Sequence, residues 1–126
     1  NEDLVVRACF LLNLGKLSIQ KSVLNAQAAS ANEKRILKNL YPTTIALLSK
    51  NKELRDVAEL ISEFRREFEE PMRPEAQVLK VAAAFEGISF PKLYKTGVTS
   101  LKQAENIFRN AYPHPHCRKF SELLAK

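Results

Sequence analysis

The sequence is poor in the residues that build disulfide-linked, membrane-spanning or nucleotide-binding domains. It has no tryptophan, two cysteines (Cys9 and Cys117) and three glycines. Two cysteines cannot form a disulfide framework, so we expect a reducing, intracellular compartment. The longest apolar run near the start covers residues 8–12, far short of the roughly 20 residues that a membrane span needs. Three glycines also leave no Gly-rich loop for phosphates.

The composition is that of a folded domain. The chain has 126 residues, of which 45% are hydrophobic, and at this length folding hides about two-thirds of the surface. This composition excludes disordered and collagen-like classes. We expect one domain over residues 1–126, either complete or a fragment of a longer protein.

Positive charge is in excess and unevenly placed. The chain holds 20 Lys and Arg against 14 Asp and Glu, which leaves +6. Residues 15–52 carry seven bases and one acid (+6), residues 53–87 five bases and nine acids (−4), and residues 88–126 seven bases and two acids (+5). If the fold brings the two basic stretches together, they form a cleft that attracts a polyanion. The alternative is a set of solvated helix faces.

Hydrophobic residues recur at helical spacing along almost the whole chain, and no strand pattern is present. The sequence therefore predicts an all-α fold, a compact bundle of about six to seven short helices. The predicted helices cover residues 2–14, residues 23–40 with an interruption near Ser30 and Asn32, a short stretch that Thr43 or Thr44 caps after Tyr41-Pro42, Asn51 to Pro71, Pro74 to Gly87, a stretch that Ser100 caps, and a last short helix with Phe120.

Three details of this interpretation concern single residues. Cys9 falls on the apolar face of the first helix, which predicts a small core residue. Gly87 is expected to be the C′ residue that ends a helix. The stretch after it, up to Thr99, is expected to be a loop that Phe90 and Leu93 anchor.

No constellation of residues indicates catalysis. His114, His116 and Cys117 lie within four residues, but this spacing is not that of zinc ligands, and Cys9 would have to supply the fourth. The carboxylates of residues 53–70 alternate with arginines, which is typical of surface ion pairs rather than of an acid/base pair. We expect a protein that is not an enzyme and that uses no metal or cofactor.

One segment carries a family resemblance. Residues 57–93, VAELISEFRREFEEPMRPEAQVLKVAAAFEGISFPKL, resemble the N-lobe of phlebovirus-type (bunyavirus) nucleoproteins, and the later Ala111-Tyr112-Pro113 is similar to that family's Tyr-Pro stretch. The resemblance implies a viral protein of the host cytoplasm or virion whose Arg73 and Lys80 line a groove for single-stranded RNA. Self-association is a further expectation from it.

A second resemblance covers the first half. Residues 4–19, LVVRACFLLNLGKLSI, with residues 45–50 and 54–64, resemble the helical N-terminal domain of transcription elongation factor TFIIS. This resemblance implies a nuclear protein-interaction module that binds a disordered, acidic-aromatic peptide of a transcription protein.

The leading hypothesis is sequence-independent binding of single-stranded RNA in a basic groove that encapsidates it. Such binding needs cations for phosphates and apolar or aromatic surfaces for unstacked bases. The candidate cations are Arg73, Lys80, Lys92, Lys95, Arg118 and Lys119, and the candidate rings are Phe85, Phe90, Tyr94 and Tyr112. The alternatives are the interaction module and a helical scaffold that binds no ligand.

Overall fold

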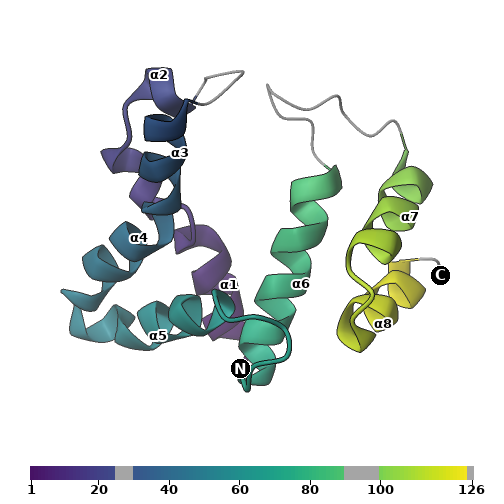
Figure 1. Cartoon of the computed structure of the whole chain (residues 1–126). Helices are drawn as coiled ribbons and strands as arrows, with labels where there is room; N and C mark the ends of the chain where they lie inside the picture. The colour runs from purple at the N-terminus through teal and green to yellow at the C-terminus, as the bar shows by residue number, and fades with distance from the viewer. Residues whose placement is uncertain (25–29, 90–99, 125–126) are drawn as a thin grey trace.

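The chain folds into helices. The structure is a computed structural model that describes residues 1–24, 30–89 and 100–124. Within these ranges it has eight α-helices, two short 3₁₀ helices and no strand, so the all-helical prediction is confirmed. In chain order they are α1 (Glu2–Leu11), η1 (Leu14–Ser18), α2 (Lys21–Leu24), α3 (Ala31–Lys38), α4 (Leu40–Ser49), η2 (Lys52–Leu54), α5 (Arg55–Phe64), α6 (Pro74–Ser89), α7 (Leu101–Ala111) and α8 (Pro115–Leu124) (Figure 1). None of these described helices is long and apolar enough to cross a membrane.

A first hydrophobic cluster joins α1, α4, α5 and the start of α6. Leu4, Ala8 and Leu12 are four residues apart and lie on one face of α1 and its end. From α5 the cluster takes Val57, Ala58, Leu60, Ile61 and Phe64. The opposite face of α5 is charged and exposed, which confirms the amphipathic helix that its sequence predicts.

A second hydrophobic cluster joins the C-terminal half of α6 to α7 and α8. Its buried members are Val81, Ile88, Ala104, Phe108 and Cys117, with Phe68, Ala84, Phe85, Tyr112 and Phe120 packed around them. The Phe108 ring meets those of Phe85 and Phe120 edge to face, at centroid distances of 5.5 and 5.9 Å. Helix α6 contributes Leu79 to the first cluster and Val81 to the second, so it is the wall that both share.

One hydroxyl group ties η1 to α4. The Gly15 N–H donates to Thr44 Oγ1 at 2.8 Å, and this hydroxyl lies 3.0 Å from the Leu40 carbonyl oxygen and 3.3 Å from that of Leu12, either of which can accept its proton. Gly15 is required there because a Cβ atom would collide with the Leu40 carbonyl. Since η1 begins and α4 follows the segment that carries α2 and α3, this tie holds both ends of that segment together.

The predictions around Tyr41 were wrong. Helix α4 begins at Leu40, before Tyr41-Pro42, rather than after them. Pro42 is tolerated because it lies in the first helical turn, where the backbone N–H has no acceptor within the helix. Thr44 is not a cap, since its hydroxyl makes the buried tie to Gly15. The predicted break at Ser30 is confirmed, because Ser30 caps α3.

Three single-residue predictions were also wrong. Cys9 is exposed, because the apolar run of residues 8–12 is wider than the face of α1 that the other helices cover. Gly87 lies inside α6, and no described glycine has a positive φ. Helix α5 ends at Phe64, so Phe68 lies beyond it and packs on the second cluster. Phe90 and Leu93 lie outside the described residues.

Candidate nucleic-acid interface

The segment of η1, α2 and α3 projects from the first cluster, and we call it the basic arm (residues 14–24 and 30–39) (Figure 1). Its bases are Lys16, Lys21, Lys34, Arg35 and Lys38, and its one acid is Glu33. All five bases are exposed. None of them forms an ion pair with any part of the chain that the structure describes. Their charge is therefore available to a ligand.

Helix α3 of the basic arm is held mainly by its caps. The Ser30 hydroxyl accepts from the Glu33 N–H at 3.3 Å, and the Glu33 carboxylate accepts from the Ser30 N–H at 2.6 Å. These hydrogen bonds lower the pKa of Glu33. The carboxylate is thus turned toward the backbone rather than toward the lysines. Arg35 and Lys38 in the last turn suit the negative end of the helix dipole.

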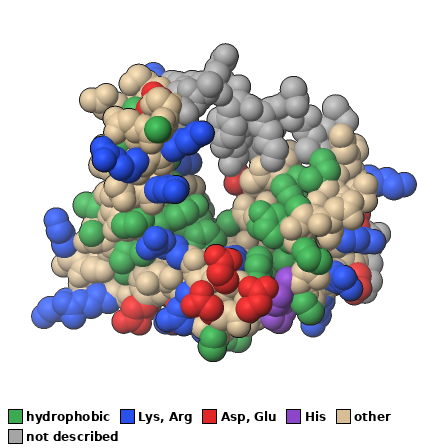
Figure 2. Space-filling model, viewed as in Figure 1, with side chains coloured by type: hydrophobic (Ala, Val, Ile, Leu, Met, Phe, Trp, Pro, Cys, Tyr) green, Lys and Arg blue, Asp and Glu red, His purple; other side chains and the backbone are tan. Residues whose placement is uncertain are grey.

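A hollow lies between the basic arm and the half that holds α6 and α7. Figure 2 shows Lys and Arg side chains on the arm beside this hollow and hydrophobic side chains along its floor. The first turn of α4 follows the arm directly, and its Tyr41 packs on the first cluster. The hollow therefore combines a cationic wall with an apolar floor, which is what a single strand needs.

Arg73, in the link before α6, is occupied by carboxylates. Its guanidinium lies 2.7 Å from Glu63 Oε1 and 3.7 Å from Glu59 Oε2, and its backbone N–H donates to Glu63 Oε2 at 2.9 Å. The hydrogen bonds to Arg73 hold the pKa of Glu63 below its ordinary value. The start of α6 also lies at the end of the helix away from the hollow (Figure 1). Arg73 therefore stabilises the α5–α6 link.

Lys80 also has partners within the chain. Its Nζ donates to the carbonyls of Phe64 at 3.2 Å and Arg66 at 2.5 Å, which are left over at the end of α5. The same ammonium lies 4.9 Å from the centroid of the Phe68 ring. Lys80 thus closes the end of α5 and links the two hydrophobic clusters.

The remaining predicted site residues do not gather around Arg73 and Lys80. Tyr112 ends α7, is half-buried, and packs on Phe108 with 5.3 Å between ring centroids. Arg118 and Lys119 are exposed on α8. Lys92, Tyr94 and Lys95 lie outside the described residues. The sequence pointed to both ends of the chain, but the structure provides the clearest set of unpaired bases on the arm.

The His-Pro-His-Cys stretch packs against the second cluster. The His114 ring stacks on that of Phe68 at a centroid distance of 4.9 Å, and its Nδ1 accepts from the His116 N–H at 3.4 Å. Cys117 is fully buried, which raises the pKa of its thiol. Residues 1–24, 30–89 and 100–124 contain no group of three or more His, Cys, Asp or Glu placed to hold a metal ion.

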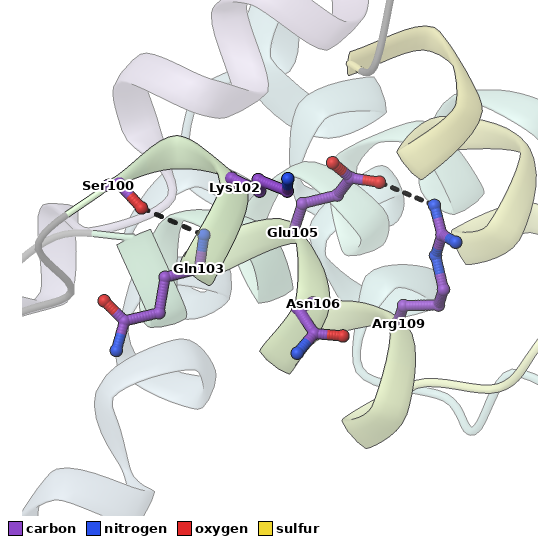
Figure 3. A pocket seen from close by; sticks show the side chains of 6 residues that line it. All are labelled: Ser100, Lys102, Gln103, Glu105, Asn106 and Arg109. Carbon is purple, nitrogen blue, oxygen red and sulfur yellow. Dashed lines mark hydrogen bonds and ion pairs between the residues drawn. The ribbon is translucent and has the colours of Figure 1, made fainter.

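A shallow pocket of about 420 Å³ runs along α7 (Figure 3). Its lining is Ser100, Lys102, Gln103, Glu105, Asn106 and Arg109. Ser100 caps the helix by accepting from the Gln103 N–H, and Glu105 pairs with Arg109 at 2.6 Å. These contacts satisfy the helix end and its charges, and the side chains spread along one helix instead of converging on a reacting atom.

Comparison of this chain with protein-family models, with curated proteins and with solved structures found no match. The argument for function therefore depends on the surface itself.

Proposed function

We propose that this protein binds single-stranded RNA, largely without regard to sequence, through phosphate contacts on the basic arm. The observation that carries the proposal is the set of five exposed bases without ion pairs beside an apolar-floored hollow. Other bases of the chain are neutralised: Arg7 pairs with Asp3 at 2.7 Å and Arg109 with Glu105 at 2.6 Å. Unpaired cations release counterions from a polyanion, which drives sequence-independent binding.

The resemblance to phlebovirus-type nucleoproteins supports the same ligand but a different set of cations. It implies Arg73 and Lys80, whereas both of these side chains are engaged by protein groups. We therefore assign the phosphate contacts to the arm, with Arg118 and Lys119 of α8 as further exposed candidates. Encapsidation and self-association remain predictions from the resemblance.

The test compares two pairs of neutralised lysines. Lys34→Gln with Lys38→Gln removes charge from the arm, and Lys50→Gln with Lys52→Gln removes the same charge from the far end of α4. Binding of a labelled single-stranded RNA is measured by fluorescence anisotropy over a range of salt. The slope of log affinity against log salt is about 0.7 per phosphate contact, so the arm variant should lose about 1.4 and the control variant little.

Three further results bear on the proposal. Wild-type protein should copurify with nucleic acid, which its absorbance ratio reveals because the chain lacks tryptophan. Equal loss of slope in both double variants would contradict the assignment to the arm. Binding of an acidic-aromatic peptide in place of RNA would favour the interaction module of the elongation-factor type.

A further inference from the structure

The face of α4 that packs on the first cluster extends into the hollow. Tyr41, Ile45 and Leu48 are spaced i, i+4, i+7 and lie on one face of α4. Leu48 is buried in the first cluster, and Ile45 and Tyr41 pack against it. Tyr41 lies at the start of the helix, directly after the basic arm, and is half-buried. It therefore closes the cluster on the side of the arm.

The face of α6 that packs on the same cluster ends in a carboxylate. Leu79 and Ala83 belong to the first cluster or pack against it. Glu86 follows at the next position of the same stripe, one turn beyond the cluster, where it is exposed. Glu86 makes no ion pair within the described parts of the chain. An acid without a partner thus lies on the wall opposite the arm.

Tyr41 and Glu86 influence one another across the floor of the hollow. Burial raises the pKa of the Tyr41 hydroxyl, and the negative charge of Glu86 raises it further. The Tyr41 ring meets Phe64 at a centroid distance of 5.3 Å and an angle of 76°. Its hydroxyl forms no hydrogen bond with residues 1–24, 30–89 or 100–124. A ring and two polar groups therefore remain available to a ligand.

We propose that Tyr41 and Glu86 form a base-binding pair that favours nucleobases with an exocyclic amino group. The inference rests on the proposed function, because it concerns the bases of a strand whose phosphates lie on the arm. The opposite charges of the two walls orient that strand: lysines attract phosphates and Glu86 repels them. The bases consequently face α6, where the Tyr41 ring packs against one of them.

The amino preference follows from the chemistry of a carboxylate. An ionised carboxylate only accepts hydrogen bonds, so it pairs with the N4 amino group of cytosine. Uracil carries a carbonyl oxygen at the same position and cannot donate to Glu86. Cytosine and uracil are otherwise similar in size and stacking surface, which makes them a matched pair of probes.

The experiment measures the affinity of oligo(rC) and oligo(rU) of equal length for the full chain. Wild-type protein should bind oligo(rC) about fivefold more tightly, as expected for one charge-assisted hydrogen bond. Glu86→Gln should bring the affinity ratio close to one, because an amide both donates and accepts. Glu122→Gln, which removes an exposed acid from α8, should leave the ratio unchanged.

Variants of Tyr41 test the ring. Tyr41→Leu should weaken both oligonucleotides about fivefold or more while Tyr41→Phe retains the stacking contribution. A loss of unfolding free energy in Tyr41→Leu with unchanged RNA affinity would show a purely structural role and overturn the proposal. Salt-dependent binding of both oligonucleotides with equal affinity would overturn the base-binding pair alone. Absence of salt-dependent binding to either one would overturn the proposed function as well.

Discussion

Glycine is required at residue 15 and not at residue 87. A Cβ atom at Gly15 would collide with the Leu40 carbonyl and crowd the Thr44 hydroxyl. We expect Gly15→Ala to lower the free energy of unfolding by about 1–3 kcal/mol, the usual cost of overpacking. Urea unfolding followed by far-UV circular dichroism measures this change.

Gly87→Ala is the matched control. A Cβ atom at Gly87 meets nothing within 4 Å, and the residue lies inside α6. Alanine is the better helix former, so this variant should gain about 0.5–1 kcal/mol. A shift of both variants in the same direction would contradict the close contact at Gly15.

The Glu63–Arg73 pair should make stability depend on pH. Hydrogen bonds from Arg73 lower the pKa of Glu63 in the folded state below its ordinary value of 4.5. The pair therefore contributes fully above that ordinary value, and its contribution is lost as the pH falls through the folded-state pKa. We expect the urea midpoint of the wild type to fall more steeply than that of Glu63→Gln between about pH 6 and pH 3.

Glu59→Gln is the control for this pH dependence. Its side chain is 71% exposed and lies 3.7 Å from Arg73, so solvent screens the pair. This variant should follow the wild-type pH profile. Identical profiles for the wild type and Glu63→Gln would show that Arg73 contributes nothing through this carboxylate.

Residue charges could be counted from the sequence, but their partners could not. The sequence identified the basic stretch of residues 15–52, where the arm's unpaired lysines lie. It also singled out Arg73 and Lys80, whose partners Glu63 and the Phe64 carbonyl are 10 and 16 residues away. Such pairing is set by the packing of α6 on α5. Tyr41 was missed because the Tyr-Pro dipeptide was interpreted as a helix end.

At the scale of elements, α3 differs from the other helices because none of its residues is buried. Ser30→Ala removes the cap, which typically costs about 0.5–2 kcal/mol. We expect faster amide hydrogen exchange over residues 34–38 and an unchanged free energy of global unfolding. A loss of global stability would show that α3 carries more of the packing than its exposure indicates.

The elements that the sequence predicted best have strong local signals. Helix α5 has an unbroken amphipathic stripe, Pro74 begins α6, and Ser100 caps α7, all as predicted. The outer face of α1 was not predictable, because Val6, Cys9 and Phe10 are as apolar as its buried stripe. Which stripe is covered depends on the positions of α5 and α6, and local periodicity does not contain that information.

For the whole molecule, the shared wall of α6 predicts that both clusters unfold together. Phe108 is fully buried in the second cluster, so Phe108→Ala should cost about 3–5 kcal/mol. Far-UV circular dichroism and tyrosine emission should report the same, lower urea midpoint, as two-state unfolding requires. Phe108→Leu gives a smaller loss if the alanine variant does not fold. Separate midpoints for the two probes would mean that the clusters unfold independently.

The arm carries its positive charge at one end, while the segment of residues 53–87 holds a net charge of −4. Figure 2 shows acidic side chains gathered below the hollow, away from the arm. A body with this permanent electric dipole rotates in the field of a polyanion before the two touch. Encounters therefore begin arm first, and added salt slows the approach of the two molecules more than it shortens the lifetime of their complex.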